Sequence, residues 1–157
     1  MIDIKIPGFG NLQLSHLALD YNGTLATDGE LLPGVREALK DLSADLHIHV
    51  LTADTFGFAA KQVAGLPFLK LVVIGLDSQA EEKLEHVSQI GVDNVVAIGN
   101  GRNDRKMLQA AAVGIALVQK EGGSAETLVS ADVVSTNILD ALELLRNPKR
   151  LIATLRS

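Results

Sequence analysis

The stretch LALDYNGTLA, from Leu17 to Ala26, is the most informative part of the sequence for predicting the fold. Its apolar residues lead directly to Asp20, and an Asn-Gly-Thr turn follows at residues 22–24. A short apolar run that ends in a carboxylate and a turn is typical of a buried strand whose end faces a polar site. Asn22 stands two residues later, where a second carboxylate would complete a metal-binding pair. The interpretation of Asp20 therefore depends on which other polar residues lie beside it.

Further short apolar runs follow along the chain, and segments with helical spacing lie between them. The runs are residues 47–53, 69–75, 94–100, 114–118 and 131–135. Each is nearly continuous, as expected of strands that are covered on both faces. The intervening segments carry apolar residues three or four positions apart, as at Val35, Leu39 and Leu42. This alternation predicts one α/β domain over residues 1–157, with a three-layer, doubly wound, Rossmann-like parallel sheet.

The two ends of the chain add two expectations. Ile2, Ile4 and Ile6 alternate with polar residues, and the turn PGFGN leads to the run that ends at Asp20, which predicts an N-terminal β-hairpin. Pro148 is expected to separate the last core helix from a short amphipathic one, which packs on the domain or mediates a dimer.

The connections are too short for a cap domain, because a turn and one helix fill the segment after Thr24, and a short helical stretch follows Asp54. The site would then be open, or covered by a neighbouring subunit. Phe56 and Phe58 lie near its expected entrance, and they are either contact residues or core residues; we slightly favour the core.

Composition excludes several classes of function. A net charge of −5 argues against affinity for nucleic acid or an anionic membrane surface. The chain has no cysteine, so no disulfide framework, thiolate metal site or cysteine nucleophile is expected. No signal-peptide pattern and no apolar run of about 18 residues is present, which predicts a cytoplasmic protein without a membrane partner.

Polar residues collect where the apolar runs end, and ligands of open α/β sheets bind at the carboxyl ends of the strands. Asp20, Thr52, Asp54 and the loop Gly99–Asp104 are the main examples. Each also has an ordinary structural explanation. An aspartate can cap a helix, an asparagine beside glycine can form a turn, and Lys83 on the expected helix 79–90 can be solvated. The prediction of a site rests on the conjunction of these residues.

The order of these motifs resembles the haloacid dehalogenase superfamily. LALDYNGTLA resembles its first motif, and HVLTAD, with Thr52, resembles the second. Lys83 in EEKLEHV matches the third motif, and AIGNGRNDRKML resembles the fourth. The resemblance runs from about Leu17 to about Val134. The Asn-Gly-Thr turn and GNGRND look most like the phosphorylation domain of P-type ATPases, so the chain is similar to a soluble relative of that domain.

The resemblance implies a Mg²⁺-dependent phosphohydrolase that forms an aspartyl-phosphate on Asp20. A hard divalent cation would offset the charge of the phosphoryl group, and Thr52 and Lys83 would bind its oxygens. Asn103 would position Lys83 or the phosphoryl group. The implied residues are catalytic Asp20, Asn22, Thr52 and Lys83; phosphate-binding Gly23, Thr52, Ala53, Lys83 and Asn103; and metal-binding Asp20, the carbonyl of Asn22, Asn100 and Asp104. The implied partner is a small phosphorylated substrate or a phosphorylated macromolecule, and a homo-oligomer stays open.

Asn22 is the main departure from the superfamily pattern, which has a general acid and base at this position. A carboxamide performs neither role near neutral pH, and loss of such a group costs about 10²–10⁴-fold in rate. We therefore expect slow hydrolysis of alkyl phosphates and a preference for good leaving groups. Asn100 likewise replaces a customary acid, which would leave Asp104 as the acidic metal-binding partner of Asp20.

Three alternatives remain open at this stage. The chain could be an ATP-dependent autophosphorylating domain, or a phosphate- or metal-binding module without turnover. A receiver-type signalling domain also combines an acidic pocket with a threonine and a lysine. The Asn-Gly-Thr turn, the GNGRND loop and the placement of the acids argue against the receiver interpretation.

Overall fold

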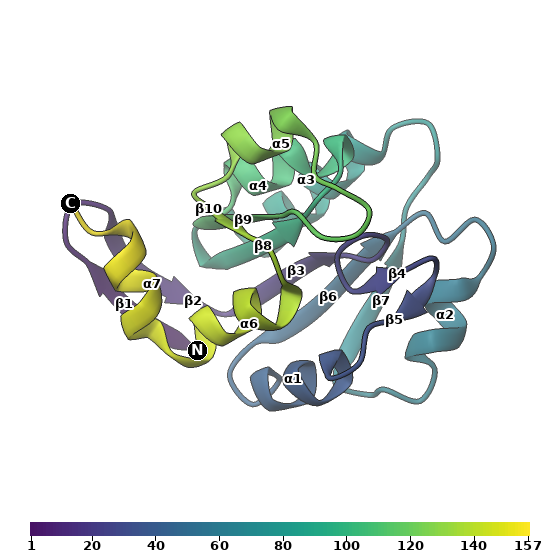
Figure 1. Ribbon diagram of the computed structural model, residues 1–157, viewed down its shortest axis with the longest axis horizontal. Helices are drawn as coiled ribbons and strands as arrows, with labels where there is room; N and C mark the ends of the chain where they lie inside the picture. Colours follow the sequence, from purple (N-terminus) through teal and green to yellow (C-terminus); the bar gives the residue numbers. More distant parts are fainter.

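A parallel sheet of six strands forms the centre of the protein in this computed structural model, which describes residues 1–157 (Figure 1). In spatial order the strands are β10 (Val133–Ser135), β9 (Val113–Leu117), β8 (Val95–Gly99), β3 (His16–Asp20), β6 (His47–Thr52) and β7 (Leu69–Val73). The chain builds outward from β3 first through β6 and β7, and then crosses to β8 on the other side. Asp20 therefore ends a central strand at the point where the strand order reverses, which is where open α/β sheets bind ligands.

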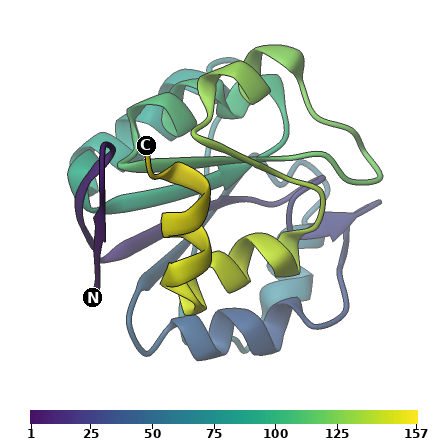
Figure 2. The same ribbon diagram turned by 60° about the vertical axis from the view of Figure 1, so that its left-hand side comes forward.

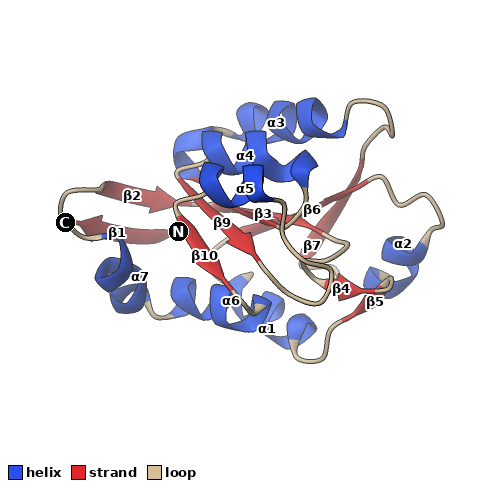
Figure 3. Cartoon of the chain, turned by 45° about the horizontal axis from the view of Figure 1, so that its top comes forward, coloured by secondary structure: helices blue, strands red, loops and turns tan.

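Helices cover both faces of this sheet, and the predicted doubly wound α/β class is confirmed. One face carries α3 (Gln79–Ile90), α4 (Arg105–Ala110) and α5 (Ala125–Ser130). The opposite face carries α1 (Val35–Leu42), α2 (Phe58–Val63) and α6 (Ile138–Arg146), as Figure 3 also shows. Two apolar clusters fill the spaces between the layers, and nearly all their members are aliphatic. Two single-turn 3₁₀ helices, η1 (Val92–Asn94) and η2 (Arg102–Asp104), flank β8.

The N-terminal hairpin forms a separate antiparallel sheet of β1 (Ile2–Ile6) and β2 (Gly10–Leu14). The hairpin prediction is confirmed, but its second strand ends at Leu14 and does not continue into the run that carries Asp20. Ser15 separates the two, and its backbone bonds to Asn94 and His47 instead. The last helix, α7 (Pro148–Leu155), packs against β1 with Leu151 buried, so the tail covers the hairpin of its own chain (Figure 2).

Sequence patterning located the long helices well and missed the short elements. The helix expected at residues 79–90 is α3 with the same bounds. The hairpin of β4 (Ala26–Thr27) and β5 (Glu30–Leu31) was not expected, because two-residue strands leave no periodicity. Strand β7 lies at an edge with Val73 63% exposed, so the expectation that every apolar run is covered on both faces is wrong there. No cap domain interrupts the connections. None of the helices is both long enough and apolar enough to cross a bilayer.

All four histidines of the chain gather around the amino ends of β3 and β6, at the opposite end of these strands from Asp20. His49 is central: its Nε2 lies 3.1 Å from His16 Nδ1, and its Nδ1 lies 3.0 Å from His86 Nε2. His47 stacks beside His16. Burial, followed by the neighbouring charges of His86, His16, Lys70 and His47, lowers the pKa of His49 to about 4. The pKa values of His16 and His86 are lowered as well, mainly by burial.

This histidine chain predicts acid sensitivity. Since the folded-state pKa of His49 lies below its unfolded value of 6.5, the unfolded chain binds more protons, and folding stability is lost as the pH falls from about 6.5 toward 4. The free energy of unfolding in urea, measured across this window, should fall for the wild type. The decline should be shallower for His49→Gln, and parallel slopes for the two proteins would contradict this assignment.

Candidate active site

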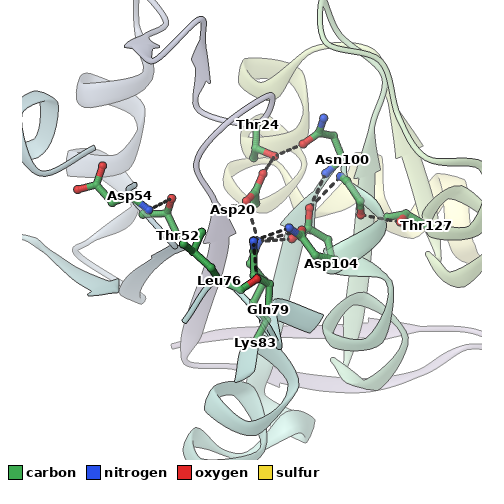
Figure 4. Close-up of polar contacts among 12 residues, drawn as sticks. Asp20, Thr24, Thr52, Asp54, Leu76, Gln79, Lys83, Asn100, Asp104 and Thr127 are labelled. Carbon is green, nitrogen blue, oxygen red and sulfur yellow. Dashed lines mark hydrogen bonds and ion pairs between the residues drawn. The ribbon is translucent and has the colours of Figure 1, made fainter. Parts of the chain in front are cut away.

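A buried lysine joins two aspartates at the carboxyl edge of the sheet (Figure 4). Lys83 Nζ donates to Asp20 Oδ1 at 2.7 Å and to Asp104 Oδ1 at 2.7 Å. Lys83 is 1% exposed, and it lies on the buried face of α3 together with Ala80 and Val87. The structure therefore brings together three residues that are far apart in the sequence, and the alternative of a solvated lysine is wrong.

The charges of this triad stabilise one another. Burial by itself would lower the pKa of Lys83, but the charges of Asp20 and Asp104 and their hydrogen bonds outweigh it and raise this pKa above its usual range. Lys83 therefore stays protonated throughout the neutral range. Burial and the charge of Asp20 raise the pKa of Asp104, whereas Lys83 opposes that shift. One ammonium between two carboxylates leaves the triad with an excess of negative charge.

Asp104 links Lys83 to the backbone of the loop after β8. Its Oδ2 accepts hydrogen bonds from the backbone amides of Asn100 and Gly101, at 3.0 and 2.9 Å. A Cβ at Gly99 would lie 2.4 Å from Asp104 Cγ, so only glycine permits this close approach. Asp104 is fully buried and does not line the cavity beside Asp20. Both its oxygens hold Lys83 and the loop, and its predicted role as a metal ligand stays a prediction.

Asn103 and Gln79 extend the contacts of Lys83. Asn103 Oδ1 accepts from Lys83 Nζ at 3.2 Å, and its amide nitrogen donates to Gln79 Oε1 at 2.7 Å. Gln79 therefore fixes the orientation of the Asn103 amide, so that its oxygen faces the lysine. Asn103 lies where the sequence expected it. Gln79 was missed, because a glutamine in the first turn of a helix carries no distinguishing pattern.

Thr24 connects Asp20 to Asn100 on the other side. Its hydroxyl lies 3.1 Å from Asp20 Oδ2 and 3.4 Å from Asn100 Oδ1. Asn100 is also held in place, since its amide nitrogen donates to the carbonyl of Gly122 at 3.0 Å. The Asp20 carboxylate and the Asn100 amide oxygen thus converge on one hydroxyl. Thr24 was not among the predicted site residues, although the Asn-Gly-Thr turn includes it.

The Asn22–Gly23 turn is closed by a hydrogen bond of its own backbone. The Gly23 amide donates to the carbonyl of Ala26 at 2.9 Å, and Gly23 does not line the cavity. The turn uses this amide internally, and the predicted contact of Gly23 with phosphate stays a prediction. Gly23 has φ +79°, and a Cβ there would meet the Asn100 side chain at 2.3 Å, so the position requires glycine. Asn22 is exposed and lines the cavity, and no hydrogen bond reaches its carbonyl oxygen.

The second strand end supplies Thr52 and Ala53. Thr52 is buried, and its oxygen accepts from the Asp54 amide at 3.2 Å, which leaves its hydroxyl proton free to donate. The Asp54 carboxylate accepts from the amides of Ala59 and Ala60 at the start of α2. Asp54 is therefore a helix-capping residue that also reaches the cavity. Thr52 and Ala53 line the same cavity as Asp20, as the sequence predicted.

The cavity itself measures about 470 Å³ and carries an excess of acidic side chains. Asp20, Asp28, Asp54 and Glu121 line it, and Lys83 is the one basic residue among the lining residues. A phosphate group in this cavity would meet mostly negative charge. A cation beside Asp20 would remove that repulsion, which is an electrostatic argument for a metal-dependent site.

The donor atoms next to Asp20 fit a hard, oxygen-binding cation such as Mg²⁺. The candidates are Asp20 Oδ2, Asn100 Oδ1 and the carbonyl of Asn22, all of them oxygens. Mg²⁺ accepts one or two carboxylates and completes its shell with water and substrate phosphate. The structure contains no group of three acidic or histidine side chains that could hold a metal ion. A single carboxylate among these donors therefore predicts weak binding in the absence of phosphate.

A family model described as haloacid dehalogenase-like hydrolase matches residues 78–137, which carry Lys83 and the Gly99–Asp104 loop. The match covers the part of the chain that carries the third and fourth motifs of the predicted resemblance to the haloacid dehalogenase superfamily. Two uncharacterized proteins of Methanocaldococcus jannaschii are similar in sequence. One is 40% identical over 83 residues, which is 50% of this chain and 89% of that protein. The other is 49% identical over 39 residues, which is 25% of this chain and 89% of that protein.

Solved structures of 3-deoxy-D-manno-octulosonate 8-phosphate phosphatases share the fold of this chain. The Moraxella catarrhalis enzyme, solved with magnesium, phosphate and KDO, has a TM-score of 0.70 and 17% identity, over 91% of this chain and 94% of that one. The cobalt-bound Haemophilus influenzae enzyme has a TM-score of 0.69 and 13% identity, over 92% and 94%. These comparisons do not support the finer resemblance to P-type ATPases, which stays a prediction.

Removal of the central lysine tests the triad. Lys83→Met would leave two buried carboxylates facing each other, and loss of one partner from a buried ion pair costs about 3–5 kcal/mol. We expect a loss of that size in the free energy of unfolding by urea at pH 7. Lys106→Met, which removes an exposed pair with Glu81, is the matched control and should change stability little. Equal effects of the two substitutions would show that the buried triad does not hold the site together.

Proposed function

We propose that this chain is a Mg²⁺-dependent phosphohydrolase in which Asp20 accepts the phosphoryl group. The observation that carries the proposal is the Asp20 carboxylate at the end of a central strand, paired with buried Lys83 and open to a cavity of about 470 Å³. The match of residues 78–137 to the haloacid dehalogenase-like hydrolase model supports it. The likeness to a phosphatase solved with magnesium and phosphate agrees with the proposed cofactor and ligand.

The proposed reaction has two displacements at phosphorus. In the first, a carboxylate oxygen of Asp20 bonds to phosphorus, and the bond from phosphorus to the leaving oxygen breaks with its electron pair on that oxygen. In the second, water attacks phosphorus, the bond to Asp20 breaks, and inorganic phosphate is released. Lys83 and the Thr52 hydroxyl offer positive charge and a hydrogen bond to the phosphoryl oxygens. Bound Mg²⁺ would offset the charge that phosphate brings next to Asp20.

The neutral residues Asn22 and Asn100 set limits on this reaction. Without an acid at position 22 no side chain there protonates the leaving oxygen, so the rate depends on how stable the departing anion is. Without a base there, the attacking water of the second step is not activated either. We therefore propose that good leaving groups react fastest and that the phosphoenzyme is hydrolysed slowly.

Two alternatives rest on the same two asparagines. If the phosphoenzyme accumulates with ATP, the domain autophosphorylates; if phosphate binds without turnover, the pocket serves as a binding module. The open cavity also suits a phosphorylated macromolecule, and the cytoplasmic location and a homo-oligomeric state stay predictions.

The decisive test is the dependence of hydrolysis on Asp20. Release of phosphate from acetyl phosphate and 4-nitrophenyl phosphate is measured with and without Mg²⁺. We expect turnover that requires Mg²⁺ and that Asp20→Asn reduces to background, because an amide cannot act as the nucleophile. Turnover that survives this substitution would refute the proposed role of Asp20. Phosphate binding by a folded wild type that shows no turnover would favour the binding module.

Restoring a carboxylate at position 22 tests the leaving-group argument. In Asn22→Asp, a new general acid should raise the rate on an alkyl phosphate such as glycerol phosphate by up to about 10²–10⁴-fold. The rate on acetyl phosphate should rise much less, since acetate leaves without help. Asn11→Asp, at an exposed position in the N-terminal hairpin, controls for the added charge. An unchanged ratio of alkyl to acyl phosphate rates would mean that Asn22 does not face the leaving oxygen.

A further inference from the structure

Two of the four phenylalanines of the chain stand exposed beside the cavity. Phe56 is 78% exposed and Phe58 is 51% exposed, and both line the cavity together with Leu76 on the loop before α3. The expectation that these two phenylalanines belong to the core is wrong. Their ring centroids lie 6.0 Å apart, with the planes tilted by 43°. Aromatic side chains that a fold leaves exposed at a cavity mark a contact surface rather than a contribution to stability.

The Phe56–Phe58 pair is held by defined contacts. The Asp54 carboxylate caps the start of α2 through the amides of Ala59 and Ala60, which fixes the backbone on which Phe58 stands. The Phe58 ring packs so closely on Gly29 that a Cβ there would lie 2.9 Å from Cδ2 of the ring. The β4–β5 hairpin is held in turn by the Tyr21 hydroxyl, which donates to the Gly29 carbonyl at 2.8 Å. Phe58 and this hairpin thus form one continuous wall.

The charges around the same wall select against anions. Asp28 sits at the tip of the β4–β5 hairpin, and Glu121 accepts from the Asp28 amide at 3.3 Å, so two carboxylates stand close to the phenylalanine pair. No basic side chain other than Lys83 lines the cavity, and Lys83 is fully engaged by Asp20, Asp104 and Asn103. A leaving group with its own carboxylate or further phosphates would meet repulsion here, while a neutral or cationic one would not.

We propose that the substrate of this site is an aryl phosphate whose phenol-type leaving group carries no negative charge and lies against Phe56 and Phe58. The inference rests on the proposed phosphohydrolase function and narrows its substrate class. Two independent features support this substrate class. The phenylalanine pair offers an aromatic surface, and Asn22, which lacks an acidic proton, requires a leaving group that departs as a stable anion. A phenolate meets both requirements, whereas the alkoxide of a sugar phosphate meets neither.

In the proposed reaction Asp20 bonds to phosphorus as the aryl oxygen–phosphorus bond breaks. The electron pair of that bond stays on the phenolate, whose charge spreads into the ring, and a proton from water completes the phenol after release. No side chain has to donate that proton, which accounts for an asparagine at position 22.

The first experiment separates ring recognition from leaving-group reactivity. kcat/KM is measured with Mg²⁺ for phenyl phosphate and for acetyl phosphate, which has a good leaving group but no ring. In Phe56→Ala/Phe58→Ala the ratio of the two values should fall about tenfold, as expected for loss of aromatic contacts. The matched control is Phe9→Ala, which removes an exposed phenylalanine from the turn of the N-terminal hairpin. A ratio that stays within about twofold of the wild type overturns the inference, as does an equal fall in Phe9→Ala.

The second experiment tests the charge of the leaving group. At low ionic strength, phenyl phosphate should be preferred over 4-carboxyphenyl phosphate by about fivefold or more, and salt should reduce the preference. Asp28→Asn/Glu121→Gln should relax it, whereas Glu37→Gln, on the exposed side of α1, should not. A preference that is absent, or that survives the double substitution, overturns the charge argument.

The source of the aryl phosphate is distinguished by comparing phosphotyrosine amide with a phosphotyrosyl peptide flanked by alanines. A higher kcat/KM for the peptide assigns the site to a macromolecule, and equal values assign it to a small molecule; both agree with the inference. Faster hydrolysis of the matching phosphoseryl peptide overturns it. If no phosphate ester or acyl phosphate is hydrolysed in an Asp20-dependent way, the proposed function itself fails, which is a different outcome from an unchanged substrate ratio.

Discussion

The ion pairs of Lys83 with Asp20 and Asp104 are the interaction on which the rest of the site depends. Each charge is nearly or fully buried, and an unpaired charge at such a depth would cost several kcal/mol. The three residues come from β3, α3 and the loop after β8, so the triad fixes the positions of these three segments relative to one another. It also orders the Asn100 and Gly101 amides through Asp104. The position of the candidate nucleophile is thus a consequence of charge neutralisation in the interior.

The fold supplies the direction of these side chains. Parallel strands β3, β6 and β8 end at one edge of the sheet. Asp20 and Thr52 are the last residues of β3 and β6, Asn100 directly follows β8, and all three line the same cavity. Glycine is required where these turns meet: a side chain at Gly23 would strike Asn100, and one at Gly99 would strike Asp104. Close packing of turns, rather than flexibility, accounts for glycine at both positions.

The two asparagines and the exposed phenylalanines determine the chemical properties of the cavity. Asn22 and Asn100 offer oxygen atoms to the cavity but neither acidity nor charge. The β4–β5 hairpin and the start of α2 then form one wall of the cavity, with Phe56 and Phe58 on it and Asp28 and Glu121 close by. Under the proposed function, this wall is the part of the structure that would select the leaving group.

The sequence by itself determined the α/β class, the long helices and the strand ends that carry Asp20 and Thr52, because periodicity and apolar runs depend on local spacing. It could not predict that Asp104 pairs with Lys83, since the partner of a carboxylate depends on residues far away along the chain. The sequence also could not predict that Phe56 and Phe58 are exposed, because apolar residues in a connection belong to no periodic pattern that indicates burial. Only the tertiary structure decided that Lys83 is buried, as its burial is tolerable only where two carboxylates from other segments meet it.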